Sequence, residues 1–490
     1  MNEWDKRSPQ EMRVFQDHKI HEYLTQYVYP FSPHYKKLFD DNKIDPKKIR
    51  SVRDLRHIPF TTKVDITPTD VHPTKFRDFI LQPDEHKIKH AWPLSKLLPL
   101  VFKKITKGAE RVKKDLALEF RPNFMSATTG RTAAPISFLY SPYDIERLKV
   151  AGVRLADVMA AGPEDKVLNL FPYAPHLAFW QVAMAGFAKP LFILSTGGGK
   201  VLGTERNLIV IDKIKPEDII GVPGYMYHLM RTAKEKRSDW SFVKRVVLGA
   251  EKVTVALKEK MLELLAAMGA KDPYIFGTYG FTEAKMAWAE CPVRIPASSG
   301  YHTYPDMEIF EILNPETGEP VGEGEDGEIV YTSLDARGSV VLRFRTGDLA
   351  QGGMVWSPCI HCGRTVPRIS SNITRVSNIK DLHLTKIKGT LVNLNTFADI
   401  LSSAKEIDEW QVEIRKRDND PHGLDELDIC IAVRDGVNQE ALKTRLTSLC
   451  EAETEVRPNT IQIVPLAEML QRLGMETEMK EKRFVDSRPS

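Results

Sequence analysis

The order of hydrophobic and polar residues divides the chain into helical, alternating and strand-rich stretches. Apolar residues at helical spacing predict a first helix over Arg13–Val28, ended by Pro30 and Pro33. Between residues 143 and 260, helical stretches alternate with short apolar runs, a pattern typical of a mostly parallel sheet with helices on both faces. The strands predicted there are Val167–Phe171, Leu191–Leu194, Ile219–Gly221 and Val246–Leu248.

The later part of the chain has a different pattern. Turn-rich segments at Asn314–Gly318 and Gly322–Gly327 predict an antiparallel β-subdomain over about residues 300–370. Its predicted strands are Glu308–Leu313, Gly327–Ser333 and Val340–Phe344. Towards the C-terminus, predicted strands Trp410–Lys416, Leu427–Val433 and Thr460–Val464 alternate with helices Thr396–Ala404 and Asn438–Glu453. We therefore expect an α/β fold with a large N-terminal domain and a small α+β domain.

Composition narrows the class of protein. The 490 residues exceed one ordinary domain, and 42% hydrophobic with 28% charged residues describe a soluble globular chain. A net charge of +3 gives no reason to expect nucleic-acid binding. No apolar run approaches the roughly 20 residues of a membrane-spanning helix, and the first 19 residues are too charged for a signal peptide. Five cysteines without a secretion signal favour a reducing compartment, with the cytoplasm as the default.

One stretch has the chemistry of an anion-binding loop. Residues 124–138 read FMSATTGRTAAPISF, so the hydroxyls of Ser126, Thr128 and Thr129 precede Gly130 and Arg131. Hydroxyls, backbone N–H groups and a cation in one tight loop can hold a triphosphate. The spacing is not that of a Walker loop. Taken alone, the stretch is equally compatible with a polar turn between two strands.

Two loops that follow predicted strands are also candidates for ligand binding, because ligands on parallel sheets lie beyond the carboxyl ends of the strands. Gly249, Ala250 and Glu251 follow one strand. The segment FPYAPHLAFW, residues 171–180, follows another and supplies aromatic walls for an acid pocket, with Tyr173 and Phe179 as substrate-binding candidates. His176 within it either touches substrate or packs among the aromatic rings.

Further motifs occur in a fixed order. They are Pro59-Phe60-Thr61-Thr62-Lys63 with Asp65, then Tyr279-Gly280-Phe281-Thr282-Glu283, then RFRTGDL at residues 343–349, and finally EMKEKRFVD at residues 478–486. With the phosphate loop, these motifs resemble those of phenylacetate–coenzyme A ligases in the adenylate-forming superfamily, over nearly the whole chain. The resemblance implies a domain of residues 1–376 and a mobile C-terminal lid domain of residues 377–490.

The resemblance also implies a role for each motif. Ser126, Thr128, Thr129, Gly130 and Arg131 would bind the ATP phosphates, and Gly249, Ala250, Glu251 and Tyr279 would surround adenine. Thr282 would contact the α-phosphate, Glu283 would hold Mg²⁺, Asp348 would accept hydrogen bonds from ribose, and Arg375 would complete the ATP site. Gly280 would border both ATP and acid. The catalytic set would be Lys480, Arg131, Thr282 and Glu283.

The implied reaction has two halves. A carboxylic acid, aryl or arylacetic by resemblance, forms an acyl-adenylate, and rotation of the lid then admits the thiol of coenzyme A. A different acceptor, such as an amine or a cofactor phosphate as in F390 synthetases, is a second hypothesis. A non-catalytic nucleotide-binding descendant is a third, favoured by Ala127 where the family has glycine and by Ser377-Asn378 where it has an acidic pair. The oligomeric state stays open, a homodimer included.

Two features lie outside this scheme. Cys291, His302, Cys359 and Cys362 form a ligand set typical of a structural zinc site, and the related ligases carry the same elements in the same order. Four unrelated side chains are the alternative. Residues 95–120 form an insertion with apolar residues at helical spacing and many lysines. Such a helix either packs on its own domain or lies against a membrane or a partner.

Overall fold

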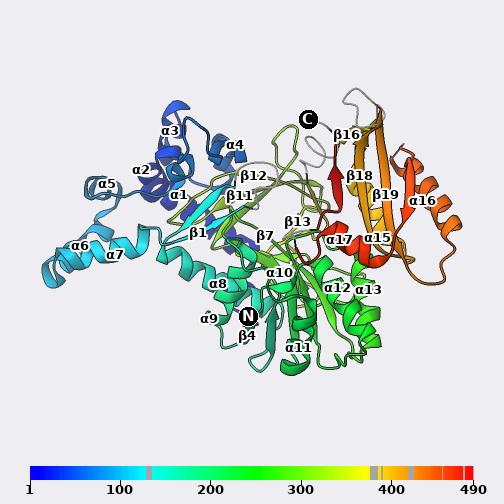
Figure 1. The fold of residues 1–490 in the computed structure, drawn as a ribbon. Coiled ribbons are helices and arrows are strands. Elements are labelled where there is room, and N and C mark those ends of the chain that lie inside the picture. The colour runs from blue at the N-terminus through cyan, green and yellow to red at the C-terminus, as the bar shows by residue number, and fades with distance from the viewer. Residues whose placement is uncertain are drawn as a thin grey trace.

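The computed structural model describes residues 1–128, 135–375, 384–387, 390–417, 424–454, 456–477 and 481–488. Figure 1 shows a large lobe, which we define as residues 1–375, beside a C-terminal lobe, residues 394–488. The large lobe combines helices with mixed sheets, and the C-terminal lobe has a hydrophobic core of its own. The predicted fold class is confirmed. The predicted domain boundary at residues 376 and 377 lies outside the described residues and stays a prediction.

A six-stranded sheet forms the centre of the large lobe. Its strands run in the order β4-β3-β5-β6-β7-β8, and all are parallel to their neighbours except β8. The strands are β3 (Lys166–Asn169), β4 (Phe192–Ser195), β5 (Asp218–Gly221), β6 (Arg245–Leu248), β7 (Tyr274–Phe281) and β8 (Met286–Ala289). The four predicted strands coincide with β3 to β6 apart from one or two residues at their ends. The connecting helices are α8 (Pro142–Val158), α9 (Leu177–Ala188), α10 (Gly198–Leu202), α11 (Thr204–Ile214), α12 (Pro223–Glu235) and α13 (Val255–Ala267).

Helices at the N-terminus cover one side of this lobe. Ser8 and Glu11 form a capping box, so α1 (Pro9–Tyr23) begins before the predicted Arg13. Helical backbone continues through η2 (Leu24–Val28) and α2 (Tyr29–Phe31) and stops before Ser32, so the helix ends between Pro30 and Pro33 and three residues after the predicted Val28. The other elements are η1 (Trp4–Lys6), α3 (Pro33–Asp41), η3 (Pro46–Lys48), η4 (Val52–His57), α4 (Lys63–Ile66), η5 (Lys75–Phe79), α5 (Glu85–Ala91), α6 (Leu94–Lys107) and α7 (Ala109–Phe120).

Antiparallel strands complete the large lobe. One sheet has the order β10-β11-β12-β15, with β10 (Glu308–Leu313), β11 (Gly327–Ser333), β12 (Phe344–Ala350) and β15 (Ile373–Arg375). The first two are as predicted, but the predicted strand Val340–Phe344 is wrong, because β12 only begins at Phe344. Arg343 has a φ of 44°, which ends extended backbone just before β12. Smaller strands are β1 (Phe124–Ala127), β2 (Ser137–Tyr140), β9 (Tyr301–His302), β13 (Met354–Val355) and β14 (Arg368–Ile369).

The C-terminal lobe is a four-stranded sheet covered by helices. Its order is β20-β19-β18-β21, with β18 and β19 antiparallel and the outer strands parallel to their neighbours. The elements are α15 (Leu394–Ser403), β18 (Ile407–Lys416), β19 (Asp425–Val433), α16 (Gln439–Thr454), β20 (Thr460–Ile463), α17 (Leu466–Leu473) and β21 (Phe484–Asp486), preceded by the hairpin β16 (Leu384–Ile387) and β17 (Thr390–Asn393). Met469 and Leu473 of α17 share a buried cluster with Met226 of the large lobe, so the lobes also share apolar surface.

Candidate active site

The predicted loops meet at one edge of the central sheet. Strands β3, β5, β6 and β7 are consecutive parallel neighbours, so their carboxyl ends lie side by side. Residues 171–180 follow β3, residues 249–251 follow β6, and Thr282 and Glu283 follow β7. This is the edge at which open α/β sheets bind ligands.

The phosphate loop is described at its two ends only. Thr129, Gly130 and Arg131 lie outside the described residues. Ala127 donates its N–H to the carbonyl of Pro175 at 2.7 Å, which ties the loop to residues 171–180. Thr128 exchanges backbone and side-chain hydrogen bonds with Ile136 at 3.0 Å. Ala127 lies in β1 with a negative φ, so alanine in place of the family's glycine brings no backbone strain.

A buried polar group that the motifs did not reveal supports this loop. The Ser126 hydroxyl lies 3.1 Å from the hydroxyl of Tyr140, and the ammonium of Lys285 lies 5.2 Å from the centre of the Tyr140 ring. Burial raises the pKa of Tyr140, and the charge of Glu283 raises it further. Glu283 itself is only 5% exposed. The phosphate loop and the predicted Mg²⁺ ligand therefore share one buried environment.

The Gly249-Ala250-Glu251 turn has a special backbone. A Cβ atom at Gly249 would lie 2.4 Å from the Thr278 hydroxyl, so only glycine fits against β7. Ala250 has a φ of 72°, a left-handed conformation that alanine rarely adopts. The turn presents Glu251 to a cavity between the lobes.

Two predicted nucleotide residues are brought into contact. The hydroxyl of Tyr279 donates to Asp348 Oδ2 at 2.9 Å, although 69 residues separate them. The Tyr279 ring stacks on Tyr301 with centroids 5.7 Å apart, and both Tyr279 and Asp348 are half-buried. Asp348 lies opposite Arg375 in the register of β12 and β15. A carboxylate fixed beside an aromatic ring is suited to a nucleoside, with the ring for the base and the carboxylate for ribose hydroxyls.

The early PFTTK segment holds β12 in place. Thr61 accepts a bond from Arg345 at 2.9 Å and donates to Arg343 at 3.1 Å, both through backbone groups. The guanidinium of Arg343 lies 4.2 Å from the centre of the Phe60 ring. This segment therefore supports the strand that carries Asp348.

The aromatic loop after β3 is attached to β1. His176 Nδ1 lies 3.0 Å from the carbonyl oxygen of Ala127; a carbonyl only accepts, so Nδ1 is the donor. The rings of Tyr173 and Phe179 meet edge to face at 5.0 Å. Phe179 is buried whereas Tyr173 is 66% exposed, so this loop has both a packed and an open side. Gly280, which follows Tyr279 in β7, is exposed at the same edge of the sheet.

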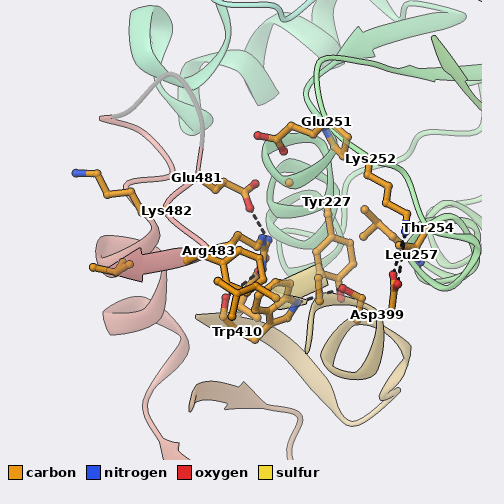
Figure 2. A pocket seen from close by; sticks show the side chains of 18 of the residues that line it. Tyr227, Glu251, Lys252, Thr254, Leu257, Asp399, Trp410, Glu481, Lys482 and Arg483 are labelled. Carbon is orange, nitrogen blue, oxygen red and sulfur yellow. Dashed lines mark hydrogen bonds and ion pairs between the residues drawn. The ribbon is translucent and has the colours of Figure 1, made fainter. Parts of the chain in front are cut away.

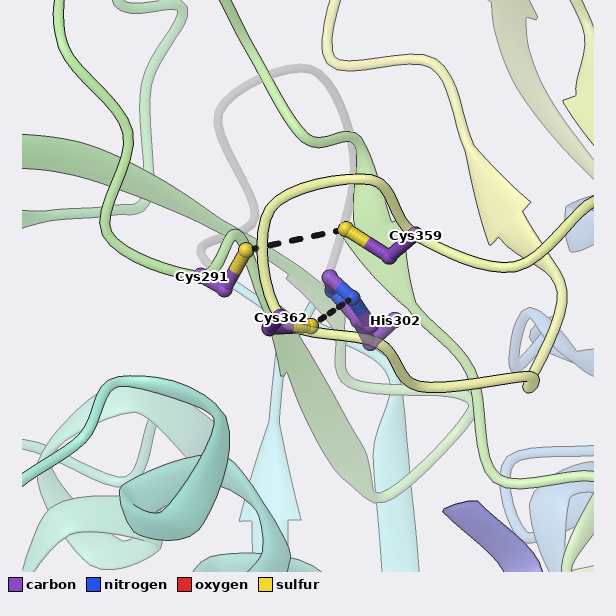
Figure 3. A group of neighbouring side chains, drawn as sticks. All are labelled: Cys291, His302, Cys359 and Cys362. Carbon is purple, nitrogen blue, oxygen red and sulfur yellow. Dashed lines mark hydrogen bonds between the residues drawn. The ribbon is translucent and has the colours of Figure 1, made fainter. Parts of the chain in front are cut away.

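The three cysteines and the histidine form one cluster. Cys291, His302, Cys359 and Cys362 each offer a ligand atom, and these atoms all lie within 4.8 Å of one another (Figure 3). Cys291 Sγ and Cys359 Sγ are 3.9 Å apart, close to the ~3.8 Å edge of a tetrahedral zinc–thiolate site. Cys362 Sγ lies 3.3 Å from His302 Nε2. The hydrogen bond between Cys291 and Cys362 lowers the pKa of Cys362 to about 7, and hydrogen bonds with Cys359 and Cys362 raise that of Cys291.

A cavity of about 650 Å³ lies where the two lobes meet. Figure 2 shows Glu251, Lys252 and Tyr227 on its large-lobe side and Trp410, Glu481 and Arg483 on its C-terminal side. Glu481 pairs with Arg483 at 2.5 Å and lies so close to α12 that a Cβ at Gly224 would fall 1.1 Å from its Oε1. Sequence reasoning did not single out Glu481, and its only signal was an acid between lysines. Lys480, just before it, lies outside the described residues.

Comparison with known proteins agrees with this geometry. A family model described as AMP-binding enzyme matches residues 147–335. The phenylacetate–coenzyme A ligase of Thermus thermophilus is 24% identical over 426 residues, which are 86% of this chain and 82% of the relative. The ligase of the same name from Aromatoleum evansii is 25% identical over 71% of this chain and 68% of its own length. The chain is therefore similar to phenylacetate–coenzyme A ligases over most of its length, and residues 147–335 are similar to the AMP-binding enzyme family.

Solved structures of a CoA ligase share the fold of this chain. A 2-hydroxyisobutyryl-CoA ligase in the postadenylation state, in complex with 2-HIB-AMP, superposes with a TM-score of 0.73 at 19% identity, covering 99% of this chain and 91% of that one. The same ligase in the thioesterification state gives a TM-score of 0.60 at 18% identity and the same coverage.

Proposed function

We propose that this chain is an AMP-forming acid–coenzyme A ligase that activates a carboxylic acid as an acyl-adenylate, with an aryl or arylacetic acid preferred. The observation that carries the proposal is the Tyr279–Asp348 pair beside the loops at the carboxyl edge of the sheet. Support comes from the phenylacetate–coenzyme A ligases that match most of the chain. The mobile lid, residues 377–490, is part of the proposal.

The proposed roles follow from where the residues lie. Asp348 accepts hydrogen bonds from the ribose hydroxyls, and the Tyr279 ring borders the base together with the turn at residues 249–251. Thr282 contacts the α-phosphate, and the hydroxyls of Ser126 and Thr128 help to hold the phosphates. Arg131 and Lys480 stabilise negative charge as the acid attacks the α-phosphate. Gly280 and the loop with Tyr173, His176 and Phe179 bind the acid.

Glu283 is the proposed magnesium ligand. Its carboxylate is buried at the end of β7, beside the group that supports the phosphate loop, and oxygen ligands suit Mg²⁺. When bound, the ion would neutralise charge on the triphosphate. The residues present therefore fit the ion that this chemistry uses.

A panel of acids tests the proposal. Pyrophosphate release should depend on an acid, with aryl and arylacetic acids ahead of short aliphatic ones, and added coenzyme A should yield the thioester and raise turnover. Acid-dependent pyrophosphate release that coenzyme A leaves unchanged would move the assignment to an amine or phosphate acceptor. No pyrophosphate with any acid, despite ATP binding, would establish a non-catalytic nucleotide-binding protein.

The half-reactions can be measured separately. Lys480→Ala should abolish adenylate formation and leave thioester formation from a supplied acyl-adenylate largely intact, with Lys482→Ala as the matched control. Equal loss of both half-reactions would remove Lys480 from its assigned role.

The Tyr279–Asp348 pair allows a second test. Asp348→Ala should raise the KM for ATP far more than that for the acid, at a cost of roughly 2–4 kcal/mol, since charged hydrogen bonds contribute ~1.5–3 kcal/mol each and are not additive. Tyr279→Phe keeps the ring and loses only the 2.9 Å bond, so its effect should be much smaller. An unchanged KM for ATP in Asp348→Ala would contradict the ribose assignment.

We further propose that Cys291, His302, Cys359 and Cys362 bind one structural Zn²⁺. Four protein ligands leave no open position for chemistry, and three of them are buried. Elemental analysis of protein purified without added metal should find about one zinc per chain. Cys359→Ser should lose it and melt at a lower temperature, whereas Cys450→Ser, at a buried cysteine outside the cluster, should keep it. Less than about 0.2 zinc per chain, with unchanged melting of Cys359→Ser, would refute the site.

Two further expectations accompany this proposal. In the described residues, no helix is long and apolar enough to cross a membrane. A cytoplasmic location and a homodimer stay proposals, which fractionation of cells and a mass measurement in solution would test.

A further inference from the structure

The insertion at residues 95–120 is a helical hairpin whose outer face has no partner within the described chain. Figure 1 shows α6 and α7 projecting from the large lobe on the side away from the C-terminal lobe. Gly108, with a φ of 83°, makes the turn between the two helices. None of the residues of α6 is buried. The hairpin is therefore a surface element along most of its length.

The base of the hairpin is firmly attached to the large lobe. Phe120 is buried against Tyr27 and Trp92, with ring centroids 6.4 Å apart in both pairs. Lys96 donates to Glu22 at 2.5 Å and to the hydroxyl of Tyr27 at 2.8 Å. The orientation of α6 is thus fixed by packing on one side, and its other side stays outward.

That outward side is apolar. Leu94, Leu98, Val101, Phe102 and Ile105 are between 52% and 78% exposed. At about 100° per residue, their positions fall within an arc of roughly 100° on the helix surface. Five large apolar side chains in one stripe differ from the scattered exposed residues that any surface has.

Charge distinguishes the possible occupants of this stripe. The helix α6 contains Lys96, Lys103, Lys104 and Lys107 and no acidic residue. Residues 85–120 have nine lysines and arginines against four acidic residues, whereas the whole chain has 69 against 66. The entire positive surplus of the chain therefore lies in this region, and the remainder is net negative.

We propose that α6 docks in the plane of a membrane surface that contains anionic lipids. The stripe would enter the boundary between headgroups and acyl chains, and lysines such as Lys104, which is 56% exposed and forms a surface ion pair with Glu85 at 3.9 Å, would meet the lipid charge. A two-fold pairing of two copies of this chain fits less well, because it would set the lysines of one copy beside those of the other. The proposal does not rest on the ligase activity.

Flotation of the full-length protein with lipid vesicles tests this. The protein should float with vesicles of phosphatidylcholine mixed with phosphatidylglycerol and about 10-fold less with phosphatidylcholine alone. Phe102→Glu/Ile105→Glu should reduce binding at least ~10-fold, and Lys104→Glu/Lys107→Glu should reduce it on anionic vesicles only. Phe187→Glu is the matched control, since Phe187 is also 78% exposed but lies on α9.

Each outcome decides for or against the proposal. All variants should melt like the wild type, because no substituted side chain is buried, and pyrophosphate release in solution should be unchanged. Failure of the wild type to float with anionic vesicles would overturn the proposal, as would undiminished flotation of Phe102→Glu/Ile105→Glu. A dimer that this double variant abolishes, without any vesicle binding, would instead identify the stripe as a contact between copies.

Discussion

Two buried charge clusters of the molecule have opposite effects on the pKa of their central carboxylate, which is lowered in one and raised in the other. Inside the large lobe, Asp144 accepts backbone N–H groups of Ser141, Arg337 and Gly338 and pairs with Lys285 at 3.1 Å. Burial alone would raise the pKa of Asp144, but Lys285 and these N–H groups lower it. The carboxylate therefore stays charged and fully bonded at any ordinary pH.

The cluster between the lobes has more negative than positive groups. Arg483 forms ion pairs with two carboxylates, Glu481 at 2.5 Å and Glu409 at 2.8 Å. Burial raises the pKa of Glu481 to about 8, with Glu251 and Glu409 acting in the same direction against Arg483. The first cluster lies within one lobe, whereas the second lies at the contact between the lobes, where the proposed lid movement would break it.

Removal of the first cluster should have the largest effect. Asp144→Ala should lower the free energy of unfolding by about 3–5 kcal/mol, because it leaves the Lys285 ammonium and several N–H groups buried without their acceptor. Chemical denaturation measures the loss. Asp212→Ala, at an exposed position of α11, is the control and should change stability by less than ~0.5 kcal/mol. Equal stability of the two variants would show that the large lobe does not depend on this cluster.

Gly224→Ala should act on the lobe contact alone. The new Cβ would displace the Glu481 carboxylate, while alanine is the better residue within α12, so the large lobe should keep its stability. We expect hydrogen exchange at residues 481–486 to become about 10-fold faster, equivalent to ~1.4 kcal/mol of contact. In a Glu481→Ala background the same substitution should add nothing. If Gly224→Ala still accelerated exchange in the Glu481→Ala background, the new Cβ would clash with a group other than Glu481.

The lobe contact should also depend on pH. The pKa of Glu481 is raised from 4.5 to about 8, so Glu481 stabilises the lobe contact fully below pH 4.5. This stabilisation is lost as the pH rises through 8, by at most ~1.4 kcal/mol per pH unit. Burial lowers the pKa of Lys260 from 10.5 to about 8, so its contribution returns only between pH 8 and 10.5. Lys260 donates to the carbonyls of Ala404 and Ile407 across the contact.

Small-angle scattering should therefore find the lobes most separated near pH 8. The groups facing the two residues are Arg483, Glu409, Glu251, Asp408 and Arg434. Glu481→Gln should remove the loss of lobe contact that accompanies a rise of pH towards 8. Lys260→Met should remove the return of the contact above pH 8. A scattering profile that does not change with pH in the wild type would contradict the assigned titrations.

The exposed ion pair across the lobes should matter least. Lys252 and Asp399 are 3.3 Å apart with side chains 35% and 52% exposed. Solvent and salt screen such pairs, so Lys252→Ala should change exchange at the contact by less than ~1 kcal/mol. A larger loss than that of Gly224→Ala would reverse the order of importance proposed for the interface.

The sequence predicted what depends on local patterns. The limits of β10 and β11 were correct because turns mark both ends. The strand predicted over Val340–Phe344 failed because Val340 donates to the carbonyl of Phe79, far away in the chain. Apolar residues there pack between segments rather than alternate along a strand.

In the candidate site, too, local motifs predicted single residues, whereas contacts between distant residues required the fold. Motifs indicated Tyr279 and Asp348 separately, but the bond between them needed the fold. Nothing in the sequence connects Gly224 with Glu481, because their contact depends on how two lobes meet. The periodicity of residues 95–120 predicted helical structure, yet periodicity alone does not show which apolar face a neighbour covers.

The position of Glu481 in the sequence has a consequence for the order of events. Glu481, which lies against Gly224, directly follows Lys480, the residue proposed to serve adenylation. One short peptide thus carries both, so in the proposed mechanism a lobe movement that withdraws Lys480 would also break the contact at Gly224. The contact would then be made only in the lobe arrangement proposed for adenylation, and the two proposed half-reactions would exclude each other in time.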